Sequence, residues 1–337
     1  ASGDTRIDRR PPVADPARFS VVVPSRGDPA KLLPHLEALG RQTLPRDRFE
    51  VIVALDGAAP SPDLDTRITA SGARIARLSE RSGPGAARNA GAKLAHESFL
   101  AFTEDDVTPA PDWLERAAAR LEADPAIDVI EGSTMKPGGR PVRIRDAGGL
   151  SWLPTNLFVR RAVFQRVGGY HEGYFDRELA VYFREDSDFG FTLEQAGARI
   201  VQAPEAMVTH PDEHPGVLDP LRWARRYEMD PLLAKRHPRL FRERIEIHRL
   251  GPFRIRRPIV RASWVCVLMV AAALAAPLFG RPTWTASFLA IAIVAFLPIW
   301  AKWRFDPLRL PVALVVPFAL VASWIRGRLR VASGVLR

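Results

Sequence analysis

The sequence predicts an α/β domain, with a mostly parallel sheet covered by helices on both faces, followed by membrane-spanning helices. Between residues 19 and 210, short apolar stretches alternate with helical ones, which is typical of a parallel sheet. Beyond residue 261, two stretches of 19 residues carry no charge at all. The chain has 337 residues, of which 47% are hydrophobic. This is enough for a sizeable core and excludes a disordered chain.

The composition excludes several other classes of protein. A single cysteine, Cys266, rules out a disulfide framework and any zinc or iron–sulfur site built from several cysteines. The net charge is +10, but the part from Gly251 onward carries 12 basic groups and one acid, a net of +11. The first 250 residues therefore hold 36 basic and 37 acidic groups, a net of −1. Basic residues around apolar stretches indicate a membrane protein and argue against a nucleic-acid partner.

The expected strands and helices alternate along the first part of the chain. The strands are expected at Phe19–Val23, Phe49–Leu55, Ala73–Leu78, Phe99–Thr103 and Asp128–Gly132. The helices are expected at 29–40, 62–71, 86–97 and 110–123. In sheets of this kind, ligands bind beyond the carboxyl ends of the strands.

Polar and acidic residues follow three of these strands. Pro24, Ser25 and Arg26 follow the first strand, Asp56 follows the second, and the triplet 104–106 (Glu-Asp-Asp) follows the fourth. Three adjacent acids repel one another, and a divalent cation would relieve that repulsion. A solvated loop that caps a helix is an equally good interpretation of the triplet alone.

A second acidic cluster lies at residues 184–188, where Glu185 and Asp186 precede apolar residues at near-helical spacing. Acids at the start of a helix are stabilised by the helix dipole without any functional role. One of these carboxylates is equally suited to be a general base.

Six motifs in order resemble family 2 glycosyltransferases with the GT-A fold, over about 190 residues. They are FSVVVPSRGD at 19–28, VIVALDG at 51–57, GPGAARNAGAKLA at 83–95, FLAFTEDDVTPAPDWL at 99–114, TNLFVRRAVFQRVGGY at 155–170, and REDSDFGFTLEQAGARI at 184–200 with His210 beyond it.

The resemblance implies a role for each matching residue. It places at the nucleotide-sugar donor the residues Pro24, Ser25, Arg26, Asp56, Arg88, Asn89, Glu104 and Asp105. Asp106 and His210 are the expected ligands of Mg²⁺ or Mn²⁺, and Asp186 is the expected catalytic base, with Glu185 as its rival. Glu104 departs from the family, which has Asp at that position. Asn156, Trp223 and Arg226 are assigned to the acceptor side.

The C-terminal part is expected to hold the chain at a membrane. Segments 262–280 and 283–301 are each long enough to span a hydrocarbon core of about 30 Å, although a buried helical hairpin remains an alternative. Segment 310–325 contains two prolines and either spans the membrane, re-enters it or lies at its surface. A full third span would export the arginines of the basic tail 326–337, against the positive-inside rule.

The remaining segments complete the predicted organisation. Residues 1–18 are expected to be a flexible segment without a signal peptide, so that domain 19–218 stays on the cytoplasmic face of the inner membrane. Residues 219–261 are expected to be amphipathic and to lie on an anionic membrane surface, because ten basic residues occur between Lys235 and Arg261.

The predicted function is an inverting transfer of sugar from a nucleotide-diphosphate donor to a hydroxyl of a lipid-linked or cell-envelope glycan. A polyprenyl-phosphate glycosyltransferase is the nearest alternative, but its ionised acceptor needs no base such as Asp186. A processive synthase would need more membrane spans. A non-catalytic membrane scaffold would leave the acidic motifs unexplained. The sequence predicts neither the sugar nor the oligomeric state.

Overall fold

The computed structural model describes residues 16–141, 154–212, 216–250 and 253–336, so the expectation for residues 1–18 falls mostly outside it. The chain divides into two compact units. The first runs to Ala180 and resumes at Glu185 until residue 213, and the second comprises Val181–Arg184 and the chain beyond residue 213.

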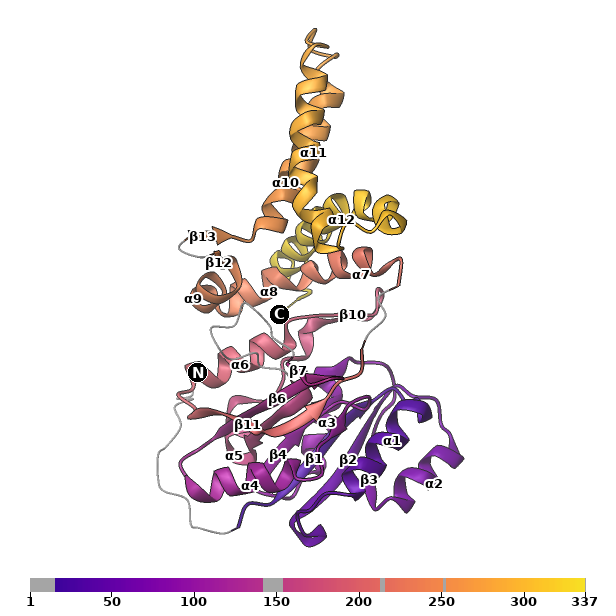
Figure 1. The fold of residues 1–337 in the computed structure, drawn as a ribbon, viewed down its shortest axis with the longest axis vertical. Helices are drawn as coiled ribbons and strands as arrows, with labels where there is room; N and C mark the ends of the chain where they lie inside the picture. The colour runs from indigo at the N-terminus through magenta and orange to yellow at the C-terminus, as the bar shows by residue number, and fades with distance from the viewer. Residues whose placement is uncertain (1–15, 142–153, 213–215, 251–252, 337) are drawn as a thin grey trace. The chain divides into compact units, whose positions relative to one another are not determined.

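The first unit is built on one mixed sheet (Figure 1), whose strands lie in the order β3-β2-β1-β4-β8-β6-β11-β5, with β7 beside β6. The strands are β1 Phe19–Ser25, β2 Phe49–Asp56, β3 Ala73–Leu78, β4 Phe99–Phe102, β5 Thr108–Pro109, β6 Val129–Lys136, β7 Arg140–Pro141, β8 Leu157–Arg160 and β11 Ile200–Thr209. Strands β3, β2, β1 and β4 are parallel, as predicted. Strand β8 lies antiparallel between β4 and β6, which the sequence did not predict.

Helices cover both faces of this sheet because the residues of β1 alternate between two cores. Val21 and Val23 pack in the core that contains buried residues of α1 (Pro29–Gly40), α2 (Pro62–Ala70) and α4 (Trp113–Ala123). Val22 packs in the opposite core, which contains buried residues of α3 (Pro84–Leu94), α5 (Arg161–Val167) and α6 (Glu185–Gln195). The predicted helix 86–97 begins two residues earlier than expected, with Pro84 in its first turn, where the absent N–H of proline costs nothing. Short elements complete the unit: η1 Arg46–Arg48, η2 Pro154–Asn156, η3 Glu172–Tyr174 and β9 Phe175–Asp176.

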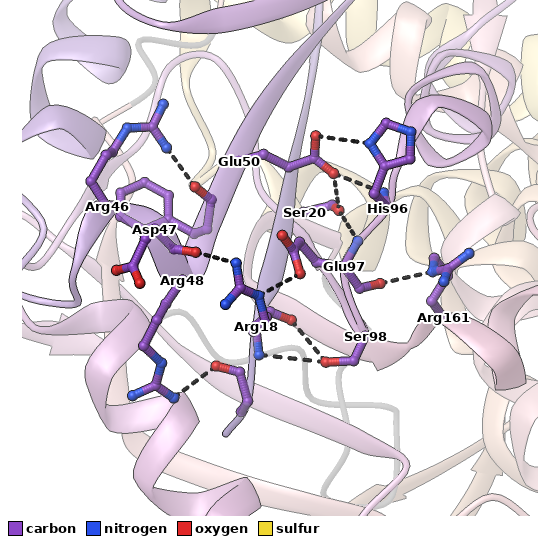
Figure 2. Close-up of polar contacts among 12 residues, drawn as sticks. Arg18, Ser20, Arg46, Asp47, Arg48, Glu50, His96, Glu97, Ser98 and Arg161 are labelled. Carbon is purple, nitrogen blue, oxygen red and sulfur yellow. Dashed lines mark hydrogen bonds and ion pairs between the residues drawn. The ribbon is translucent and has the colours of Figure 1, made fainter. Parts of the chain in front are cut away.

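A polar network holds the starts of the strands together, at the edge opposite their carboxyl ends (Figure 2). The Glu50 carboxylate of β2 accepts hydrogen bonds from Ser20 Oγ of β1 at 2.7 Å and from the His96 backbone N–H at 2.8 Å. Arg74 of β3 donates to the same carboxylate at 2.9 Å. Glu50 thereby links three neighbouring strands, β1, β2 and β3, to the segment that precedes β4.

The second unit begins with short elements. They are β10 Val181–Tyr182, α7 Asp219–Arg225, η4 Arg226–Met229, α8 Asp230–Arg236, α9 Pro238–Leu240, the π-helix η5 Phe241–Glu246, β12 Ile247–Leu250 and β13 Phe253–Arg256. Three longer helices follow: α10 Pro258–Ala275, α11 Trp284–Lys302 and, after η6 (Pro307–Arg309), α12 Leu310–Ala332. Segments Pro258–Ala275, Trp284–Lys302 and Pro307–Ala332 are long and apolar enough to cross a membrane.

The ends of these helices differ from the predicted segments. Helix α10 begins at Pro258, before the predicted residue 262, and ends at Ala275, two residues before Pro277. Helix α12 continues through Pro317 to Ala332, so the first part of the predicted basic tail is helical.

Candidate active site

The carboxyl ends of β1, β2 and β4 meet at one edge of the sheet, because the three strands are parallel and in register from Phe19. The acidic triplet after β4 is anchored there by Ser25, whose hydroxyl donates to Asp105 Oδ2 at 2.5 Å. Burial raises the pKa of Asp105, and the hydrogen bond from Ser25 opposes that rise. Asp105 therefore faces the end of β1 and fixes the loop, while Pro24 is half-buried and Arg26 is exposed.

Glu104, Asp106 and His210 form a cluster with the donor atoms of a metal site. One ligand atom from each lies within 4.8 Å of the others, and all three side chains are half-buried. Two carboxylates and an imidazole suit Mn²⁺ well and Mg²⁺ adequately. His210 Nδ1 lies 2.9 Å from the Pro211 carbonyl oxygen. Lys136 Nζ, which only donates, lies 3.3 Å from the same Nδ1, so these two contacts favour opposite tautomers of the ring. The other ring nitrogen, Nε2, is 3.8 Å from Glu104 Oε2.

Two residues of α1 support the acidic loop, and the sequence did not identify either. Lys31 Nζ lies 3.0 Å from Asp106 Oδ2 and places a positive charge at the cluster. The buried His35 ring contacts the Val107 carbonyl oxygen through Nδ1 at 2.7 Å. Burial lowers the pKa of His35 to about 4, so the ring is neutral at pH 7 and Nδ1–H donates. No local motif marks these residues, because their partners lie more than 70 positions away along the chain.

Asp56 holds the turn that precedes α3. Its carboxylate accepts from the Ser82 N–H at 2.6 Å and from the Gly83 N–H at 3.0 Å. Gly57 follows with φ +64°, and a Cβ at that position would lie 2.3 Å from the Arg81 backbone nitrogen. Only glycine allows this close approach.

The two acids at the start of α6 occupy different environments. Asp186 is half-buried, and its Oδ1 accepts from the Ser187 N–H at 2.6 Å and from the Ser187 hydroxyl at 3.2 Å. Glu185 is buried. Burial, and then repulsion by Asp186, raises the pKa of Glu185 to about 7, although Arg88 opposes the rise.

The structure shows what surrounds Arg88 and Asn89, the two residues of α3 predicted on the donor side. Arg88 is only 2% exposed, with Nη2 3.7 Å from Glu104 Oε1 and Nη1 3.9 Å from Glu185 Oε1. It therefore lies beneath the acids and not on an open donor surface. Asn89 accepts from the Tyr170 N–H at 2.9 Å and donates to the Tyr170 carbonyl oxygen at 2.8 Å, so it joins α3 to the chain at Tyr170.

Asn156, predicted on the acceptor side, is held by buried hydrogen bonds. Its amide group donates to the Ser133 and Ala206 carbonyl oxygens at 2.9 and 2.8 Å, and its oxygen accepts from Trp113 Nε1 at 2.8 Å. The residue is 1% exposed, and its role toward an acceptor stays a prediction.

Trp223 and Arg226, the other predicted acceptor-side residues, belong to the second unit. The Trp223 ring lies edge-on to Tyr227, with centroids 4.9 Å apart, and Lys302 Nζ lies 4.5 Å from its centroid. Arg226 is exposed. Their role toward an acceptor stays a prediction.

Comparison with known proteins identifies the class. The solved mannosyltransferase PcManGT of Pyrobaculum calidifontis aligns with 91% of this chain and 87% of its own, with a TM-score of 0.56 and 18% identity. The shared architecture is the GT-A fold. The family model described as glycosyl transferase family 2 matches residues 20–189, half of the chain. The chain belongs to this family.

Two curated relatives come from Mycobacterium tuberculosis. The pre-mycofactocin glycosyltransferase is 28% identical over 222 residues, which cover 60% of this chain and 44% of the relative. The N-acetylglucosaminyl-diphospho-decaprenol L-rhamnosyltransferase is 37% identical over 87 residues, which cover 26% of this chain and 24% of the relative. The chain thus spans less than half the length of either protein.

Proposed function

We propose that the chain is a metal-dependent, inverting glycosyltransferase that uses a nucleoside-diphosphate sugar. The observation that carries this proposal is that the chain has two acidic groups with different surroundings, one of the metal-binding type and one suited to be a base. Glu104 and Asp106 lie with His210 in a metal-type cluster. Asp186 lies in the first turn of α6, and among the described residues its carboxylate accepts hydrogen bonds from Ser187 and from no basic side chain.

The cluster would hold Mg²⁺ or Mn²⁺ against the donor diphosphate. The bound cation would stabilise the negative charge that develops on the departing nucleoside diphosphate. Lys31, beside Asp106, adds a second positive charge to the same edge. PcManGT, whose structure contains GDP-Man and Mn²⁺, supports this assignment by its shared fold.

Asp186 is the proposed general base. The acceptor hydroxyl must lose its proton as it attacks the anomeric carbon, and a carboxylate within reach accepts that proton. A single displacement with one base inverts the anomeric centre, and no carboxylate nucleophile is required. A phosphate acceptor would be ionised already, so Asp186 favours a hydroxyl acceptor.

The relatives favour a lipid-linked acceptor. One of them acts, by its name, on N-acetylglucosaminyl-diphospho-decaprenol, which is a lipid-linked saccharide. The apolar helices of the second unit would keep this chain at the same membrane as such a substrate. The proposed location is the cytoplasmic face of the inner membrane, where nucleotide sugars are made.

We propose further that α10 and α11 span the membrane while α12 lies along its surface. Arg326 Nε and Arg330 Nη1 of α12 lie 3.4 and 2.5 Å from Oε1 of the buried Glu228 in η4. Two spans return the chain to the side of η4. A third span would carry Arg330 about 30 Å away, since 20 helical residues rise 1.5 Å each. The contacts with Glu228 therefore support an in-plane α12.

Removal of the Asp106 carboxylate tests the proposed metal site. The Asp106→Ala variant should lose Mn²⁺-dependent binding of UDP and GDP, because the cluster keeps only two ligand atoms, while the thermal unfolding temperature stays near that of the wild type. Isothermal titration of the full chain in detergent, with Mn²⁺ or with EDTA, measures this. Binding with unchanged metal dependence would show that the cation is held elsewhere.

A further inference from the structure

Arg88 occupies an unusual position in the first unit, between the metal-type cluster and the base motif. Its guanidinium is buried, with Nη2 facing Glu104 at 3.7 Å and Nη1 facing Glu185 at 3.9 Å. Both distances are within ion-pair range but exceed a hydrogen bond. The guanidinium is thus shared between two acids and bound tightly by neither.

The packing around Arg88 fixes this position. Its guanidinium carbon lies 5.3 Å from the Tyr170 ring centroid, and that ring stacks on Phe189 of α6 with centroids 4.2 Å apart. Gly85, one turn earlier in α3, leaves room for Tyr170 and Glu185: a Cβ there would lie 3.4 and 3.8 Å from their Cβ atoms. Arg88 Nε and Nη1 have no hydrogen-bond partner among the described residues. Burying a guanidinium with unpaired donors costs free energy. A change in the charge of either acid therefore alters how strongly the guanidinium is attracted to the other acid.

We infer that Arg88 is a positioning residue that couples cation binding at Glu104 to the charge on Glu185, the neighbour of Asp186. The inference rests on the proposed function. When a cation neutralises Glu104, the guanidinium is attracted more strongly to Glu185. The first turn of α6, which carries Asp186, is then held most firmly when the donor site is loaded.

Coupling of this kind is reciprocal, so it can be measured at the cation without an acceptor or an identified donor. When the charge of Glu185 is removed, Glu104 is the one acid of the pair that still attracts Arg88. Arg88 then competes with the cation for Glu104. Removing the charge of Arg88 abolishes that competition. The effect of Glu185 on cation affinity should therefore pass through Arg88.

The test is a double-mutant cycle on the full chain in detergent, with Mn²⁺ alone as the probe. Electron paramagnetic resonance of free Mn²⁺ gives the dissociation constant at pH 8, where Glu185 is ionised. Glu185→Gln should weaken binding about fivefold or more, and Arg88→Met should strengthen it by a similar factor. In the Arg88→Met background, Glu185→Gln should change affinity less than about twofold.

Controls separate the possible failures. Arg77→Met removes an exposed arginine of β3 that pairs with Asp65 at 2.6 Å, and should leave Mn²⁺ affinity unchanged. If Arg88→Met does not fold, as judged by thermal unfolding, Arg88→Gln replaces it in the cycle. Equal effects of Glu185→Gln with and without Arg88 would overturn the coupling but not the metal site. Absence of Mn²⁺ binding by the wild type would overturn both.

Discussion

Adjacent acids in the first turn of α6 have different chemical properties because their side chains face different surroundings. Glu185 faces Arg88 in the interior, and its pKa is raised to about 7. Asp186 is half-buried and bound only by the next residue in the hydrogen bonds described. A base must be accessible to the acceptor, and the half-buried Asp186 meets this condition better than the buried Glu185, whose raised pKa also disfavours its ionised form near pH 7.

Asp186→Asn should therefore lower turnover by about 10²–10⁴-fold while donor binding is retained, which is the usual contribution of a general base. Asparagine keeps the size of the side chain and its bond from Ser187 but cannot take a proton. Steady-state rates at saturating donor, together with nucleotide binding, measure this. Glu185→Gln is the matched comparison and should lower turnover less; the reverse order would make Glu185 the base.

The raised pKa of Glu185 also predicts a pH dependence of stability. The folded chain keeps this carboxyl protonated up to about pH 7, whereas in the unfolded chain its pKa is near the ordinary value of 4.5. Its contribution to stability is therefore fully present below pH 4.5 and is lost as the pH rises through 7. In EDTA, Glu185→Gln should show a smaller fall in unfolding temperature between pH 5 and pH 8 than the wild type. An equal fall in both would mean that Glu185 ionises normally.

The positions of the acids after the expected strands predicted which of them lie at the sheet edge. They did not predict the direction in which each side chain points. Asp106 and His210 lie together as the motifs implied, because each follows a strand whose end meets that edge. Arg88 and Asn156 are buried, and Asn89 is half-buried and bonded to the backbone of Tyr170. Their partners lie 16 to 97 positions away along the chain, and no local pattern records such contacts.

At the scale of elements, the parallel part of the sheet was predictable because β1, β2 and β4 are mostly apolar and buried on both faces. Strand β8 was not, since its four residues form too short a stretch to separate from the helix that follows at once. Strand β11 mixes buried and exposed residues without regular alternation, and its pairing with β6 is irregular between Ala203 and Met207. Both strands are defined by tertiary pairing more than by sequence pattern.

Glu50 is the residue on which the starts of the strands depend. Glu50→Ala should destabilise the first unit by about 1–3 kcal/mol, because it removes one acceptor from several donors in a partly buried network. Burial favours the neutral acid, but the hydrogen bonds from Ser20, His96 and Arg74 outweigh it and lower the pKa of Glu50. Chemical denaturation measures the loss. Glu37→Ala removes an exposed acid paired with Arg41 and should have little effect. If both variants lost the same free energy of unfolding, the network around Glu50 would not stabilise the first unit.

At the scale of the whole molecule, apolar length alone could not decide the course of the third helix. The contacts of α12 with α7 and η4 indicate its course, which composition alone does not. Gly327 lies so near η4 that a Cβ would be 2.1 Å from the Glu228 carbonyl oxygen. Helix α12 (Figure 1) therefore packs backbone to backbone with a segment that precedes α10.

The predicted topology places both ends of the α10–α11 hairpin on the cytoplasmic side. A fluorescent protein fused after Arg337 should fluoresce, and alkaline phosphatase fused there should be inactive, because α12 does not cross. Fusions after Pro282, between α10 and α11, should give the opposite pattern. Active phosphatase at the C-terminus would mean that α12 spans the membrane and that its bonds to Glu228 do not form there.

We propose that the acidic edge of the sheet activates a nucleotide sugar with a divalent cation. The most direct test of this proposal is a hydrolysis screen of nucleotide sugars by the full chain in detergent, with Mn²⁺ or with EDTA, followed by NMR of the released sugar. We expect at least one donor to be hydrolysed only with Mn²⁺, the sugar to be released with inverted configuration, and Asp106→Ala to be inactive. Hydrolysis that persists in EDTA and in Asp106→Ala would contradict this account.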